Sequence, residues 1–190
     1  EAMQKMGYYS AGTIEYLYEN GKFYFMEMNT RLQVEHPVTE YVTGVDLVYE
    51  MIRIAQGKKL RYKQSDIIIR GHSIECRINA EDPETFIPMP GKIKQFHPSA
   101  GGGVRLDTAI YNGYSIPPYY DSMIAKLIVH GTNRKHCILR LKRALNELII
   151  EGTKTNIPLH LRLLEEPDFL SGKYTIKWLE QLLAKDKETK

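Results

Sequence analysis

A run of alternating polar residues carries side chains suited to binding ions and phosphates. Its members are Glu27, Asn29, Arg31, Gln33 and Glu35. The residues between them are apolar except for Thr30. An extended backbone points alternate side chains to opposite faces, so these five groups would line one edge above an apolar underside. His36 precedes a proline, which biases it toward extended geometry and predicts that the run continues that far. Five polar groups that face one way beside an apolar underside are typical of the base of a binding site.

The run begins in an expected β-hairpin. Residues rich in β-branched and aromatic side chains flank Asn20-Gly21, the strongest short-range signal for a hairpin turn. Ser10–Thr30 is therefore predicted to form two antiparallel strands. The register of this hairpin decides whether Glu15 on the first strand meets the polar run on the second.

Two registers are open for Glu15. With the usual two-residue loop, Glu15 would face Met26, and Glu27 would point to the opposite side. With a three-residue loop and Gly21 in a left-handed bulge, Glu15 would share a face with Glu27 and Asn29. Two carboxylates side by side repel each other, so the second arrangement makes sense mainly with a cation between them.

The second register would give a metal site made only of oxygen ligands. Glu15 and Glu27 would supply carboxylates and Asn29 an amide carbonyl, a set that suits magnesium or manganese and not zinc or copper. Such sites complete their octahedra with water and substrate phosphates, which points to a nucleoside triphosphate. The alternative is that the two glutamates are ordinary exposed strand residues with lysine neighbours.

Arginine and glutamate side chains suggest a second kind of chemistry. The guanidinium of Arg31 offers a bidentate fork to a planar oxyanion, and the nearby carboxylate of Glu35 could remove a proton from that anion. Arg77 is added because alternation in the expected strand places it with Glu75 on the polar side. As a bare pattern, Glu75 with Arg77 is more typical of a surface ion pair than of a functional site.

Hydrophobic periodicity predicts the elements around these residues. Helices are expected at Asp46–Gln56, after the capping residue Asn133, at Thr155–Glu165 and at Tyr174–Leu183. Strands are expected at Ile67–Asn79, Ile93–Phe96, Val104–Ile110 and Met123–His130.

Composition excludes several classes of protein. The 190 residues are 43% hydrophobic and 26% charged, with a net charge of +3, which is typical of an ordinary globular protein and argues against a nucleic-acid or membrane partner. The only cysteines, Cys76 and Cys137, lie far apart, so neither a zinc site nor a dense disulfide framework is expected. A reduced, cytoplasmic compartment is the better prediction.

Four blocks of the sequence closely resemble the carboxy-terminal half of biotin carboxylase, an enzyme of the ATP-grasp class. The blocks are Gly12–Leu17, Phe25–Glu40, Arg70–Pro83 and Pro118–Met123. They occur in the family's order, and the likeness runs essentially from end to end of the chain.

The resemblance implies a role for each candidate residue. Glu15, Glu27 and Asn29 would hold the divalent ions, magnesium or manganese, that bridge the phosphates of ATP. The bicarbonate would be held by Arg31, Gln33, the backbone of Val34, and Arg77. Glu35 would be its general base, and Leu17 would pack against adenine. Arg77 would also stabilise the anion of biotin.

The implied activity is the ATP- and bicarbonate-dependent carboxylation of biotin held on a carrier protein, the first half-reaction of acetyl-CoA carboxylase in fatty acid biosynthesis. The implied partners are the biotin carboxyl carrier protein, carboxyltransferase subunits and a second copy in a homodimer. Near Gly101–Gly103, relatives often carry an aromatic residue associated with the subunit interface, and its absence here puts the usual dimer contact in doubt.

The expected fold is α+β, with an antiparallel sheet from the second half of an ATP-grasp module followed by the strands and helices of a biotin carboxylase carboxy-terminal domain. We expect residues 1–65 to belong to the first part and 66–190 to the second. The boundary is soft, because the resemblance implies that the two parts share one core. The family's amino-terminal half and glycine-rich lid are missing, so the chain alone is expected to be inactive. The alternatives are another ATP-grasp ligase, such as carbamoyl-phosphate synthetase, and a non-catalytic fragment for dimerisation or carrier docking.

Overall fold

A computed structural model describes residues 2–189 and shows a mixed α+β architecture, as predicted. The strands are β1 (Thr13–Glu19), β2 (Lys22–Asn29), β3 (His72–Asn79), β4 (Gln95–His97), β5 (Val104–Thr108), β6 (Met123–Gly131) and β7 (Ile149–Glu151). The helices are α1 (Ala2–Lys5), α2 (His36–Thr43), α3 (Leu47–Ala55), α4 (Arg134–Glu147), α5 (Ile157–Leu163), α6 (Pro167–Ser171) and α7 (Trp178–Thr189). A short 3₁₀ turn, η1 (Gln64–Asp66), precedes β3.

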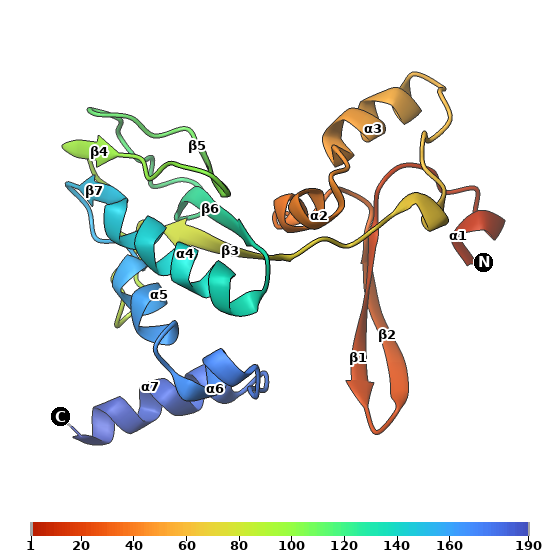
Figure 1. Cartoon of the computed structure of the whole chain (residues 1–190). Helices are drawn as coiled ribbons and strands as arrows, with labels where there is room; N and C mark the ends of the chain where they lie inside the picture. The colour runs from red at the N-terminus through yellow and green to blue at the C-terminus, as the bar shows by residue number, and fades with distance from the viewer. Residues whose placement is uncertain (1, 190) are drawn as a thin grey trace.

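All strand pairs are antiparallel and form three small sheets. The β1–β2 hairpin stands by itself and projects away from the rest of the chain, beside α2 and α3 (Figure 1). The central sheet has the strand order β3-β6-β5, and β4 pairs with β7. Within residues 2–189, none of the helices combines the length and apolar character needed to cross a bilayer.

The hydrophobic core lies between the central sheet and α4. Alternate residues of β6, including Leu127 and Val129, are fully buried on the side where α4 packs. Leu141 and Leu145 meet them from α4, because residues four apart lie on one face of a helix. Asn133 begins this helix as predicted, and its side chain accepts a hydrogen bond from the amide of His136.

The opposite face of the central sheet carries charged side chains around the buried Ile128 and lies against α2. Cross-strand neighbours share a face, and the register places Arg77 of β3 opposite Lys126 of β6, which in turn faces Asp107 of β5. Helix α2 contacts both β3 and β6. One side of the sheet therefore supplies the core, and the other supplies charged groups toward the segment that carries the polar run.

Two sequence expectations about the backbone are wrong. Strand β2 ends at Asn29, and His36 begins α2 instead of continuing an extended run. Pro37 explains the difference, because a proline in the first turn of a helix has a preset φ and lacks only an N–H that would find no partner within the helix. Helix α2 and the short helix α6 were not expected from periodicity, since both are brief and begin at prolines or next to them.

Glu75 is the least compensated charge on the polar face of the sheet. Within the described part of the chain, neither of its carboxylate oxygens has a hydrogen-bond partner, although both are buried. Desolvation raises the pKa of Glu75 to about 6, against the opposing effect of the cations Lys126 and Arg77. Arg77 pairs with Glu35, so the surface pair of Glu75 with Arg77 suggested by the sequence is wrong.

We expect Glu75→Gln to change how stability depends on pH. Because the folded pKa of Glu75 lies above its ordinary value of 4.5, ionisation opposes folding, and this destabilisation develops as the pH rises from about 4.5 through about 6. The variant should therefore gain melting temperature relative to the wild type as the pH rises through that window. Differential scanning calorimetry between pH 4 and pH 8 measures it. A difference between the two melting temperatures that stays constant with pH would contradict the assignment.

Candidate active site

The β1–β2 hairpin combines a two-residue turn with a bulge further along. Asn20 and Gly21 have φ of 50° and 80°, the positive values at both central positions that define a type I′ turn. Pairing then continues regularly to Tyr16 opposite Phe25, as expected for a two-residue loop. The register shifts there, so that Glu15 pairs with Glu27.

The bulge places the two carboxylates on one face. Met26 is the extra residue on β2. If the register continued without this bulge, Glu15 would pair with Met26 and point away from Glu27. The expectation that a two-residue loop separates the carboxylates is therefore wrong. The expected bulge exists, but it lies within the strands and not at Gly21.

The oxygens of Glu15 and Glu27 converge on a single atom. The side-chain nitrogen Nδ2 of Asn29 donates to Oε1 of Glu15 at 2.8 Å and to Oε1 of Glu27 at 3.2 Å. Gln33 Nε2 donates to the same oxygen of Glu15 at 3.4 Å. Donors on neutral amides thus offset the repulsion between two neighbouring carboxylates.

This geometry fits a divalent cation. Within residues 2–189, no group of three or more His, Cys, Asp or Glu side chains could hold a metal. The set predicted here has two carboxylates and one amide, which leaves positions for water and phosphate oxygens. Rotation of the Asn29 side-chain amide by about 180° would exchange Nδ2 for Oδ1. Three oxygen ligands, from Glu15, Glu27 and Asn29, would then surround one position.

Arg31 joins the same cluster although it lies beyond the end of β2. Its guanidinium donates to Oδ1 of Asn29 at 3.2 Å and to Oε1 of Gln33 at 2.7 Å. The guanidinium also donates to the backbone carbonyl of Leu32 at 3.2 Å, and Arg31 is exposed. The irregular segment after β2 still brings Arg31 and Gln33 to Asn29, whereas Glu35, which a continuous strand was expected to align with them, is bonded elsewhere.

Glu35 and Arg77 form a separate pair beside this cluster. Glu35 lies at the N-cap of α2, and its Oε2 accepts a hydrogen bond from Arg77 of β3 at 2.9 Å. The two side chains are 51% and 53% exposed, so water screens the pair and it contributes roughly 0–1 kcal/mol. An anionic ligand can therefore compete for Arg77 at little cost.

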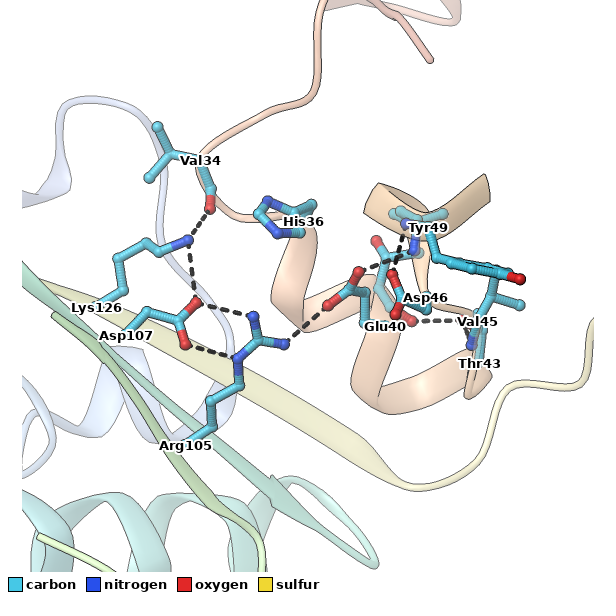
Figure 2. Close-up of polar contacts among 12 residues, drawn as sticks. Val34, His36, Glu40, Thr43, Val45, Asp46, Tyr49, Arg105, Asp107 and Lys126 are labelled. Atoms are coloured by element: carbon cyan, nitrogen blue, oxygen red, sulfur yellow. Dashed lines mark hydrogen bonds and ion pairs between the residues drawn. The ribbon is translucent and has the colours of Figure 1, made fainter. Parts of the chain in front are cut away.

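Residues that the sequence did not indicate hold Arg77 and Val34 in place. The backbone carbonyl of Arg77 accepts from Asn156 Nδ2 at 3.0 Å and contacts His160 Nε2 at 3.0 Å. Burial lowers the pKa of His160, so its ring is neutral near pH 7 with Nε2 carrying the donated proton. Lys126 Nζ donates to the carbonyl of Val34 at 3.0 Å (Figure 2).

Leu17 lies two residues along β1 from Glu15, on the same face of the hairpin. It is 56% exposed, so an apolar ligand surface beside the carboxylates could cover it. The hairpin thus presents an apolar side chain and two acids on one face.

The sequence matches two family models and several known proteins. Residues 75–181 match the model of the biotin carboxylase C-terminal domain, and residues 1–63 match the model of the carbamoyl-phosphate synthase L chain ATP-binding domain. A biotin carboxylase of Pseudomonas aeruginosa is 56% identical over 187 residues, which cover 98% of this chain and 42% of that protein. One component of the pyruvate carboxylase of Methanothermobacter thermautotrophicus is 54% identical, with 95% of this chain and 37% of that protein covered.

A solved structure shows the same fold. The biotin carboxylase domain of the 2-oxoglutarate carboxylase of Hydrogenobacter thermophilus, a dimer in complex with MgADP, ADP and bicarbonate, superposes with a TM-score of 0.91 and 50% identity. The match covers 95% of this chain and 40% of that one. The chain thus spans about two fifths of the length of these relatives. The extent of the C-terminal domain match and these identities show that the chain belongs to the biotin carboxylase family.

Proposed function

We propose that the chain is the carboxy-terminal part of a biotin carboxylase that uses ATP and bicarbonate to carboxylate biotin on a carrier protein. The observation that carries the proposal is the convergence of Glu15 and Glu27 on one point, with the guanidinium of Arg31 attached to the same cluster. The Hydrogenobacter relative binds MgADP and bicarbonate, the two kinds of ligand that these groups suit.

The metal and nucleotide roles follow from the hairpin. Glu15, Glu27 and Asn29 would hold magnesium or manganese, and Leu17 would contact adenine. When bound, the metal ion neutralises charge on the phosphates. The register shift at Met26 places the carboxylate oxygens of Glu15 and Glu27 on one face of the hairpin, where both can bind the ion.

The bicarbonate roles follow from the segment after β2. Arg31, Gln33 and the Val34 amide would hold the anion, with Arg77 on its far side. Because the Glu35–Arg77 pair is weak, bicarbonate can insert and take over the guanidinium. Glu35 would then be free to accept the proton of bicarbonate as a bicarbonate oxygen attacks the γ-phosphorus of ATP, with ADP as the leaving group.

The remaining steps need a positive charge beside biotin. The carboxyphosphate so formed would break down to carbon dioxide and phosphate. The phosphate would accept the N–H proton of the ureido ring of biotin, and the ureido nitrogen would then form its bond to the carbon of carbon dioxide. The negative charge that develops on the ureido oxygen would be stabilised by Arg77, whose backbone is fixed by Asn156 and His160.

The proposal includes the setting in which the enzyme works. We propose a cytoplasmic acetyl-CoA carboxylase that serves fatty acid biosynthesis, with a biotin carboxyl carrier protein, carboxyltransferase subunits and a homodimer of the complete enzyme. The boundary between the ATP-grasp part and the C-terminal domain is proposed near residue 65. It is supported by the core, whose buried members all come from Cys76 onward.

We expect Glu27→Gln in the full-length protein to impair metal-dependent turnover. Loss of one charged group of the clamp should lower kcat roughly a hundredfold, or about 3 kcal/mol in barrier, since the phosphoryl transfer relies on charge neutralisation. The measurement is bicarbonate-dependent ATP hydrolysis against magnesium concentration. Glu19→Gln, an exposed carboxylate at the tip of the same hairpin, is the matched control. Equal activity of both variants would exclude Glu27 as a ligand.

We expect Glu35→Gln to separate proton transfer from substrate binding. The amide can still accept a hydrogen bond from Arg77 but cannot take a proton, so turnover should fall roughly a hundredfold. The KM for MgATP should stay close to that of the wild type. The assay is steady-state bicarbonate-dependent ATP hydrolysis in the full-length protein, with Glu151→Gln on the exposed strand β7 as control. Full activity of Glu35→Gln would rule out the base role.

We expect the 190-residue chain alone to show no bicarbonate-dependent ATP hydrolysis, because phosphoryl transfer needs positioning groups beyond those present here. Isothermal titration with MgATP should still show weak heat that disappears on chelation of the metal. Turnover at the rate of a complete enzyme would refute the first expectation. Absence of any heat would favour the alternative of a non-catalytic docking fragment.

A further inference from the structure

We propose that Lys126 is a positioning residue that fixes the bicarbonate-binding turn through the carbonyl of Val34. This inference rests on the proposed function, because it assigns the turn of residues 33–35 to bicarbonate. Lys126 belongs to β6, more than 90 residues further along the chain from Val34. No pattern in the turn itself points to it.

The contacts of Lys126 are few and directional. Its Nζ donates to the Val34 carbonyl at 3.0 Å and lies 3.5 Å from Oδ2 of Asp107. The side chain is only 14% exposed. A buried ammonium must be matched by acceptors that stay in place, since an unpaired charge away from water is costly. The Val34 carbonyl is one of these acceptors. Its hydrogen bond to Lys126 therefore restricts the position of the carbonyl as well as that of the ammonium.

A series of ion pairs connects Lys126 through Asp107 and Arg105 of β5 to Glu40 of α2. Asp107 accepts two hydrogen bonds from Arg105, at 2.7 and 2.9 Å, and these bonds with Lys126 lower the pKa of Asp107 despite its partial burial. Arg105 also donates to Glu40 of α2 at 2.8 Å. Figure 2 shows this series running from Glu40 through Arg105 and Asp107 to Lys126 and Val34.

The ion pairs of the central sheet hold the turn of residues 33–35 and the helix that follows it. Val34 lies just before α2, and Glu40 lies within α2, so the central sheet holds the segment at both points. Oε1 of Glu40 also accepts from the amide of Leu47 at the start of α3. The orientation of α2 relative to the sheet, and with it the exit of the turn, is fixed by charged groups.

Fixing the Val34 carbonyl fixes the peptide that joins Val34 to Glu35. That peptide sets the direction of the Glu35 side chain toward Arg77, which lies opposite Lys126 in the sheet. Small displacements of such groups are expensive, since a misplacement of about 1 Å can cost roughly a hundredfold in rate. Loss of the Lys126 contact should therefore act on bicarbonate and leave the nucleotide site on the hairpin intact.

The test compares variants of the full-length protein by steady-state kinetics for bicarbonate and MgATP separately. Lys126→Met keeps most of the side-chain length and removes the donor and its charge. We expect kcat/KM for bicarbonate to fall roughly 10- to 100-fold, the effect of losing a hydrogen bond from a charged group, while the KM for MgATP stays within about twofold. Lys142→Met is the matched control, because Lys142 of α4 is similarly shielded, at 24% exposed, and pairs with Glu165, which follows α5.

Two further variants separate positioning from folding. Lys126→Arg restores charge and donor and should recover most of the bicarbonate kcat/KM. Asp107→Asn leaves the ammonium in place but weakens its anchor, so it should give a smaller fall that again spares MgATP. These two variants carry the test if Lys126→Met does not fold.

Two results would overturn the inference. One is an unchanged kcat/KM for bicarbonate in the Lys126 and Asp107 variants. The other is an equal loss for bicarbonate and MgATP, which a purely structural lysine would give. Failure of the proposed function looks different, because the wild-type full-length protein would then show no bicarbonate-dependent hydrolysis at all.

Discussion

Electrostatic repulsion between Glu15 and Glu27 is the constraint on which the site depends. Two carboxylates opposite each other on one sheet face destabilise a hairpin unless something positive lies between them. In this chain the amide of Asn29 occupies that place and donates to both. If a divalent cation binds as proposed, it would satisfy the same oxygens more strongly than the amide of Asn29 does.

The second constraint is the polar surface between the central sheet and α2. One face of the sheet packs on α4 through apolar residues, and the other holds Arg77, Lys126, Asp107 and Arg105. A charged interface fixes directions better than an apolar one, because hydrogen bonds to charged groups have specific geometry. The fold thus uses its core for stability and its opposite face to orient the segment between the hairpin and α2.

Much of this arrangement could be predicted from residue patterns, and particular parts could not. The Asn20-Gly21 turn, the cap at Asn133 and the grouping of Glu27, Asn29 and Arg31 follow from local rules. The bulge at Met26 does not, because alternation predicts faces only while the register is unbroken. Lys126, Asn156 and His160 were not predicted for another reason: their partners lie far away in sequence, and their approach depends on strand order and helix placement that no local pattern contains.

Anomalous diffraction from crystals of the full-length protein with manganese and ADP would locate the ion. We expect a manganese peak bound by carboxylate oxygens of both Glu15 and Glu27, at about 2.1 Å, and by phosphate oxygens of the nucleotide. A peak held by phosphate alone, with Asn29 still hydrogen-bonded between the two carboxylates, would contradict this expectation.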